Sequence, residues 1–308
     1  MKVALIGTGF WAAKLAEAAA RAREVELVAC YSRDEARRRA FAEGWGCRPA
    51  ASFDDALDDV DGVLLATPND THEEQATAAA ERGVHVFVEK PIAHTLEAGE
   101  RMRNACARGG VKLMVGHEFR RLGAARKAKE LVAAGALGTV VLAEANFSLT
   151  SPVEPGSWKA GGRGTPLVQL GVHHADTLAY LLGPVVRTTG RVNRAVSAVE
   201  IDDVGVATLE FASRALGTIA SSYVSPRTYS IRLLGTDAVL DYRTDISVWP
   251  AADRLDEVTS LTVGGEPVGF DRRDPLVEEL EEFAREGEPE TGAPEGLAAL
   301  KVILEATA

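Results

Sequence analysis

The segment VALIGTGFWA, residues 3–12, decides the fold of the N-terminal half of this chain. Four apolar residues are typical of a short buried strand, and a Gly-Thr-Gly loop follows them before a helix-forming stretch. The first glycine permits a tight turn, the second lets backbone approach a pyrophosphate, and the helix N-terminus supplies N–H groups. A plain strand-to-helix turn, with Trp11 used for packing, is the alternative. We predict a dinucleotide site built on Gly7, Thr8, Gly9, Phe10 and Trp11.

Strand-like and helix-like stretches go on alternating as far as residue 120. Further short apolar runs occupy residues 27–30, 62–66, 84–88 and 112–115, and alanine-rich, polar stretches separate them. Such alternation predicts a parallel sheet with helical crossovers. Residues 1–120 are therefore expected to form a doubly wound, dinucleotide-binding α/β domain.

The second half of the chain has a different pattern. Period-two apolar runs occupy residues 140–148, 204–211, 217–224, 231–234 and 238–242, which predicts a large, mostly antiparallel sheet. One helix is expected over residues 166–182, because Gly183-Pro184 is a strong stop signal. A last helix carries the stripe from Leu276 to Phe283 and is expected to pack back on the first domain. Residues 121–308 thus form the predicted α+β domain.

Composition excludes several classes of protein. The chain is 46 % apolar and 26 % charged, with a formal charge of −11, so nucleic acid is not an expected partner. No apolar stretch is long enough to span a bilayer, and the N-terminus enters a strand directly instead of a secretory signal. Three widely spaced cysteines fit reduced thiols and offer no metal-binding spacing. We expect a cytoplasmic protein without a metal site.

The end of the second strand bears on which dinucleotide is bound. An NAD site usually carries an acid there, on the adenosine ribose, but this chain has Ser32 followed by Arg33. Arginine can bind a 2′-phosphate through two hydrogen bonds, and no carboxylate repels it. Asp34 is accounted for as a helix cap. The sequence therefore favours NADP over NAD, with Ser32, Arg33 and Arg37 as contacts.

A lysine follows the fourth strand of the first domain directly. The strand runs into Glu89, Lys90 and Pro91, and the proline ends it because proline cannot donate to a ladder. Open α/β sheets bind ligands at the carboxyl ends of their strands, where this amine is expected to lie. A solvated strand end is the alternative for such a lysine on its own. The nearby glycine loop favours a functional role for Lys90.

Four segments in this order resemble the Gfo/Idh/MocA family of NAD(P)-dependent oxidoreductases. They are GTG at residues 7–9, ATPNDTH at 66–72, EKP at 89–91 and GVHHAD at 171–176. The resemblance implies a Rossmann domain followed by a domain with a large open sheet, acting on sugars, cyclitols or related polyols. It also implies homodimers or homotetramers built through that sheet. Residues implied to lie beside the cofactor are Thr67, Pro68, Asn69, His72, Glu89 and Lys90.

Helical spacing indicates a second catalytic element. Gln169, His173 and Asp176 stand at positions i, i+4 and i+7 of the expected helix, so their side chains share one face. Histidine titrates near neutrality and can exchange a proton with a substrate hydroxyl. Asp176 is expected to orient the ring or to contact the polyol, although a core histidine beside a surface aspartate is the alternative. Many family members carry aspartate where Gln169 stands, and glutamine cannot act as a base.

Two further groups are candidates for contacting substrate. His117, Arg120 and Arg121 follow the last strand of the first domain, and Trp158 and Lys159 precede the expected catalytic helix. A structural role is the alternative for each of them.

The sequence indicates an oxidoreductase in which His173 removes a hydroxyl proton and Lys90 stabilises the developing alkoxide. Hydride passes between the nicotinamide and a secondary alcohol or ketone of the sugar or polyol. Two alternatives remain open. One is an NAD-dependent glycosidase of the same fold, and the other is a non-catalytic dinucleotide-binding sensor or regulator.

Overall fold

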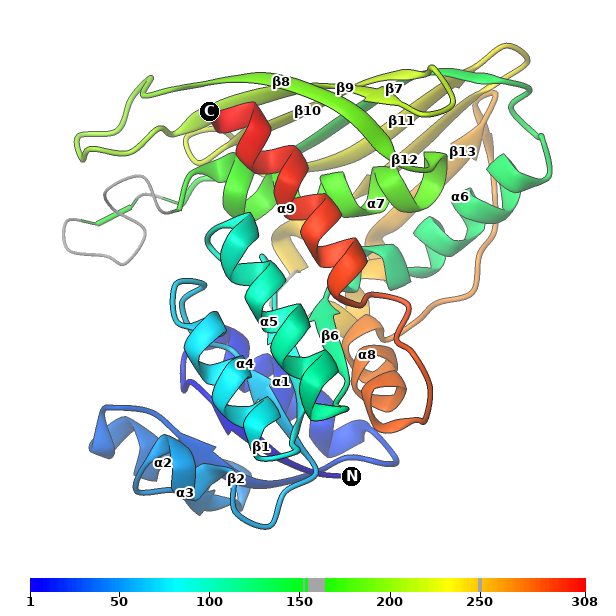
Figure 1. Cartoon of the computed structure of the whole chain (residues 1–308). Coiled ribbons are helices and arrows are strands. Elements are labelled where there is room, and N and C mark those ends of the chain that lie inside the picture. Colours follow the sequence, from blue (N-terminus) through cyan, green and yellow to red (C-terminus); the bar gives the residue numbers. More distant parts are fainter. Residues whose placement is uncertain (152, 155–163, 249–250) are drawn as a thin grey trace. The chain divides into compact units, whose positions relative to one another are not determined.

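The computed structural model describes residues 1–151, 153–154, 164–248 and 251–308 (Figure 1). The chain divides into two compact units. The first contains Met1–His117 and Leu276–Leu297, and the second contains Glu118–Pro275 and Ala298–Ala308. Within the described residues, no helix is both long and apolar enough to cross a membrane.

The first unit is built on a six-stranded sheet in the order β3-β2-β1-β4-β5-β6. All five neighbouring pairs are parallel, which confirms the predicted doubly wound fold. The strands are β1 (Lys2–Ile6), β2 (Glu26–Tyr31), β3 (Arg48–Pro49), β4 (Gly62–Leu65), β5 (His85–Glu89) and β6 (Leu113–Gly116). Residues of β4 and β6 are buried along their whole length, as expected of strands covered on both faces.

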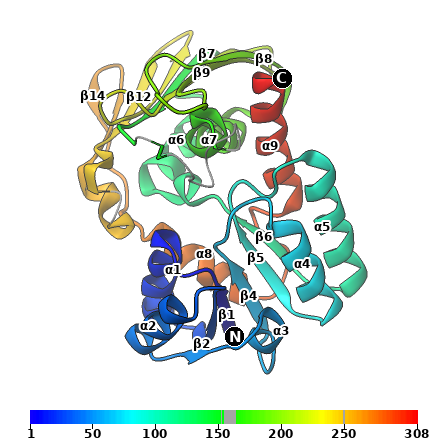
Figure 2. The same cartoon turned by 90° about the vertical axis from the view of Figure 1, so that its left-hand side faces the viewer.

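Helices cover both faces of this sheet. They are α1 (Phe10–Arg21), α2 (Glu35–Trp45), α3 (Phe53–Ala56), α4 (His72–Glu81), α5 (Leu96–Gly109) and α8 (Pro275–Ala284). Figure 2 shows α4 and α5 on one side of β4 to β6, with α1 and α8 on the other. The Phe283 ring of α8 packs edge-on against Phe87 of β5, with ring centroids 5.9 Å apart. This contact joins a C-terminal helix to the core of the N-terminal sheet.

The second unit is built on an eight-stranded sheet in the order β14-β13-β12-β11-β7-β10-β9-β8. Only β7 and β10 pair in parallel, so the expectation of a mostly antiparallel sheet is confirmed. The strands are β7 (Val140–Ser148), β8 (Val185–Asn193), β9 (Val204–Phe211), β10 (Leu216–Ser222), β11 (Thr228–Gly235), β12 (Val239–Thr244), β13 (Thr259–Val263) and β14 (Glu266–Pro267). Strand β8 has no alternating apolar pattern in its sequence. In the structure Thr188 is its one buried residue.

The helical elements of the second unit include the segment predicted to carry catalytic residues. That segment is not one regular helix, since Leu167–Gly171 forms a π turn (η2) and α7 (Val172–Leu182) begins after it. The other elements are η1 (Glu118–Arg121), α6 (Gly123–Ala133), η3 (Ile246–Val248), η4 (Ala252–Val258) and α9 (Ala293–Thr307) from Ala298 onward.

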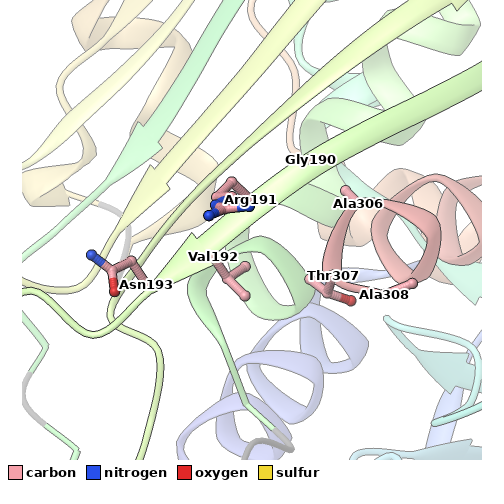
Figure 3. A pocket seen from close by; sticks show the side chains of 7 residues that line it. All are labelled: Gly190, Arg191, Val192, Asn193, Ala306, Thr307 and Ala308. Atoms are coloured by element: carbon pink, nitrogen blue, oxygen red, sulfur yellow. The ribbon is translucent and has the colours of Figure 1, made fainter.

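A pocket of the second unit lies where β8 passes the end of α9 (Figure 3). Residues Gly190–Asn193 and Ala306–Ala308 line it. A side chain at Gly190 would come within 2.4 Å of the Ala306 carbonyl oxygen, so glycine permits this close approach of strand and helix. None of the predicted functional residues that the structure describes is among the residues that line this pocket.

A buried histidine makes the stability of the second unit sensitive to acid. His174 of α7 lies 4.6 Å from the Tyr229 ring and 6.1 Å from the Phe147 ring, between centroids, and burial lowers its pKa to about 4. An unfolded histidine has a pKa near 6.5. Below that pH the unfolded chain therefore binds a proton that the folded chain excludes until about pH 4.

We predict that this difference destabilises the wild type by roughly 2 kcal/mol between pH 7 and pH 4.5. The variant His174→Phe should not show this decrease in the free energy of unfolding, because it has no group to titrate at that position. Urea unfolding at both pH values measures the free energy of unfolding, and His94→Phe, at an exposed position, is the control expected to follow the wild type. Equal losses in wild type and His174→Phe would contradict the prediction.

Candidate active site

The glycine loop between β1 and α1 has the geometry that a pyrophosphate needs. Gly7 has a φ of 107°, and a Cβ there would lie 2.5 Å from the Ala66 carbonyl oxygen. At Gly9 a Cβ would find no atom within 4 Å, so this backbone is open to a ligand. Helix α1 has no acidic residue in its first turn, and its N-cap residue is Gly9, which has no side chain to cap it. The residues present therefore fit a bound dinucleotide.

The end of β2 presents hydroxyl and guanidinium groups. The Ser32 hydroxyl donates to the Asp34 carbonyl oxygen at 3.1 Å, and the Arg38 guanidinium donates to the Ser32 carbonyl oxygen at 2.7 Å. The Asp34 carboxylate accepts from the Arg37 backbone N–H at 3.0 Å, as expected of a helix cap. Arg33 is exposed, and the Arg37 side chain is 79 % exposed beside Asp34. Sequence reasoning missed Arg38, which supports the turn from within α2.

The loop after β4 is tied to the segment after β5 by a buried histidine. Nε2 of His72 lies 2.9 Å from the Thr67 carbonyl oxygen, and Nδ1 lies 3.2 Å from that of Ile92. Burial lowers the pKa of His72, which favours the neutral ring. The Thr67 hydroxyl donates to Gln75 at 2.7 Å, and Asn69 is buried nearby in sequence. His72 therefore holds two loops of the predicted cofactor site together.

Lys90 lies at the same edge of the sheet as the glycine loop. In the register of the sheet, Ile6 pairs with Leu65 and Leu65 pairs with Val88, so Gly7, Ala66 and Glu89 follow at one level. The Trp11 indole N–H donates to the buried Glu89 carboxylate, which links α1 to the end of β5. Lys90 is partly exposed directly after this carboxylate. The structure thus brings the glycine loop, Thr67 and Lys90 to one edge of the first unit.

In the second unit, η1 lies against α7 through two charged contacts. The Arg120 guanidinium donates from Nε to Asp176 Oδ2 at 2.7 Å, and a second N–H donates to Oδ1. The Glu118 carboxylate lies 3.6 Å from Nδ1 of His173. The sequence predicted that Asp176 orients the His173 ring or contacts the polyol, and it did not predict the carboxylate of Glu118 beside this ring. The sequence shows that Glu118 follows closely after β6 (Leu113–Gly116). It does not show that His173 is its partner.

Gln169 lies in the π turn rather than in α7. The regular spacing of about 100° per residue used to group Gln169 with His173 and Asp176 therefore does not extend to it. A π turn inside a helix occurs frequently at functional sites. Gln169 and His173 are both buried in the second unit.

The remaining candidates for contacting substrate fall into two groups. His117 and Arg121 are 1 % and 2 % exposed, at the end of β6 and in η1. Trp158 and Lys159 lie outside the residues that the structure describes.

Comparison with known proteins places both units in one family. A model described as "Oxidoreductase family, NAD-binding Rossmann fold" matches residues 1–117, and the GFO/IDH/MocA C-terminal domain matches residues 125–241. The chain belongs to the Gfo/Idh/MocA oxidoreductase family. As a member of this family it is an NAD(P)-dependent oxidoreductase that acts on CH–OH groups.

Several Gfo/Idh/MocA relatives are similar over most of their length. D-xylose 1-dehydrogenase (NADP(+)) 2 of Haloferax volcanii is 33 % identical over 92 % of this chain and 88 % of its own. D-apiose dehydrogenase of Paraburkholderia graminis is 31 % identical over 80 % of this chain and 69 % of its own. A crystal structure from Desulfitobacterium hafniense, assigned as an NADPH-dependent oxidoreductase, has a TM-score of 0.94 and 36 % identity, covering 99 % of this chain and 94 % of that one.

Proposed function

We propose that this protein is an NADP-dependent dehydrogenase or reductase acting on a secondary alcohol or ketone of a sugar, cyclitol or related polyol. The observation that carries the proposal is the presence of both Lys90, at the cofactor edge of the first unit, and a buried His173 on α7. Xylose and apiose, named for two relatives, are the first aldoses to test.

The proposed reaction assigns a separate role to each polar residue. NADP held at the glycine loop of Gly7 and Gly9 would supply the hydride chemistry at the substrate carbon. His173 removes the proton from the substrate hydroxyl, and Lys90 donates a hydrogen bond to the same oxygen as negative charge develops on it. Gln169 can orient a hydroxyl through its amide but cannot accept the proton at neutral pH.

The preference for NADP rests on the residues at the end of β2. No carboxylate stands at the position of Ser32, and Asp34 is engaged as the cap of α2. A ribose 2′-phosphate would meet the Ser32 hydroxyl and the exposed Arg33 guanidinium. Two similar proteins are named for NADP or NADPH, which supports the same choice.

The outer face of the eight-stranded sheet supports a homo-oligomer. Leu216, Leu142, Leu234 and Val239 follow one another across β10, β7, β11 and β12 in the register of the sheet. Each is at least partly exposed, and Leu216 is 55 % exposed. Such an apolar row on a monomer surface is typical of an association site. We infer a homodimer or homotetramer built through this row.

The substrate assignment is tested by a panel of sugars, inositols and their keto forms with each cofactor, followed by absorbance at 340 nm. A net change in absorbance with free NADP is expected for at least one polyol. A glycosidase that re-reduces its substrate would release product without a net change.

Replacing Lys90 by alanine should lower turnover about 10²- to 10³-fold, because the developing alkoxide loses its cationic partner. Cofactor affinity, measured by fluorescence titration, should stay within about threefold, since oxyanion stabilisation acts on the reacting oxygen. The control is Lys127→Ala, which removes a partly exposed lysine paired with Glu130 at 3.0 Å. Unchanged turnover in Lys90→Ala would remove Lys90 from the mechanism.

The variant Arg33→Ala should raise the KM for NADP about 10-fold or more and leave the KM for NAD nearly unchanged, because only NADP carries the 2′-phosphate. Ser32→Asp should shift the preference toward NAD. Arg39→Ala is the matched control, since Arg39 pairs with Glu35 at 2.7 Å on the surface of α2. A wild type that binds NAD much more tightly than NADP would refute the assignment.

The variant Leu216→Glu should lower the mass of the assembly measured by light scattering, because it places a charge in the apolar row. Val196→Glu is the control, since Val196 is 74 % exposed and lies in the loop between β8 and β9. An unchanged mass for Leu216→Glu, or a monomeric wild type, would contradict this interface.

A further inference from the structure

Glu118 and His173 form a buried pair that sequence reasoning did not foresee. The Glu118 carboxylate oxygen lies 3.6 Å from Nδ1 of His173, and the two side chains are 1 % and 0 % exposed. That distance exceeds the ~2.7–3.2 Å of a direct N–H···O hydrogen bond, so the contact is electrostatic. In a buried setting, a charge so close to an imidazole strongly affects which protonation state is favoured.

Aromatic neighbours fix the orientation of the His173 ring. Phe119, the residue after Glu118, meets the ring edge-on with centroids 4.7 Å apart. Phe147 of β7 lies against it at a centroid distance of 5.6 Å. A ring packed in this way has few alternative rotamers, so Nδ1 is kept on the side of Glu118.

Among the residues that the structure describes around α7, Glu118 is the carboxylate with a close contact to this ring. Asp176 is held bidentately by Arg120, so these two charges largely offset each other. His174 has a pKa of about 4, and burial raises the pKa of Tyr229 well above its usual value, so both are neutral near pH 7. Arg121, buried in η1, is the remaining cation of that segment, and Arg126 and Lys129 of α6 are turned to Tyr180.

We propose that Glu118 is the positioning residue of His173. Its carboxylate favours the tautomer that carries the proton on Nδ1, which leaves the lone pair of Nε2 to accept the substrate proton. Once Nε2 has accepted that proton, the imidazolium is stabilised by the same carboxylate. Glu118 thereby supplies the charge that Gln169 lacks. This inference rests on the proposed function only in assigning His173 as the base.

The pair itself is tested without substrate, by following the ¹³C- or ¹⁵N-labelled histidine side chains by NMR as a function of pH. The His173 signal is assigned by its loss in His173→Gln. In Glu118→Gln, which keeps the side-chain shape but removes the charge, the titration midpoint of His173 should fall by about 1 unit or more. Glu118→Asp should give an intermediate midpoint. The exposed His94 is the internal control.

Kinetics with an accepted substrate adds a second measurement. In Glu118→Gln the acid limb of the kcat/KM profile for alcohol oxidation should move to lower pH, and the plateau should fall about 10-fold or more. KM for the cofactor should not change, and Glu130→Gln on the surface of α6 should behave like the wild type.

The two measurements separate the inference from the proposed function. An unchanged His173 midpoint in folded Glu118→Gln, or an unmoved acid limb, would overturn the role of Glu118. A shifted midpoint in a protein that oxidises no polyol would uphold the pair and refute the proposed reaction instead. Should Glu118→Gln fail to fold, Glu118→Asp carries the same test, because its shorter side chain weakens the contact and should lower the midpoint.

Discussion

The ion pair between Arg120 and Asp176 is the contact on which the polar arrangement of the second unit depends. Both side chains are buried, at 6 % and 1 % exposure, so separating them would remove a close opposite charge from each in a medium that solvates charges poorly. That penalty holds η1 in one register along α7. With Arg120 fixed at Asp176, Phe119 and Glu118 follow toward His173, one helical turn earlier. His173 and Glu118 are thus positioned by a neighbouring ion pair.

The first unit depends on a different kind of constraint, which is steric and local. The carbonyl oxygen of Ala66 leaves no room for a Cβ at Gly7, and the φ of 107° there suits glycine alone among common residues. From β1 the sheet grows in one direction through β2 and β3 and in the other through β4, β5 and β6, so the strand order reverses between β1 and β4. Open α/β sheets bind ligands at such a reversal. The glycine at position 7 is therefore required at the same point of the sheet where its topology favours binding of a dinucleotide.

Features encoded within a short stretch of chain could be predicted from the sequence. The glycine loop, the parallel strands and the position of Lys90 after β5 each depend on fewer than about ten consecutive residues. Features that depend on the partner of a side chain could not. Nothing near Glu118 or Arg120 in sequence indicates His173 or Asp176, more than fifty residues away. Strand β8 was missed for a related reason, since an edge strand needs few inward apolar residues.

The two departures from simple expectation around His173 are physically consistent with each other. The family resemblance predicts an aspartate where this chain has Gln169, and this chain has a buried glutamate, Glu118, against the His173 ring. A second carboxylate around one buried imidazole would repel the first and raise the pKa of one of them, so a single charge is the stable arrangement. Glutamine keeps the capacity to orient a hydroxyl without adding charge. The negative charge beside His173 thus comes from Glu118 of η1, and Gln169 in the π turn is neutral.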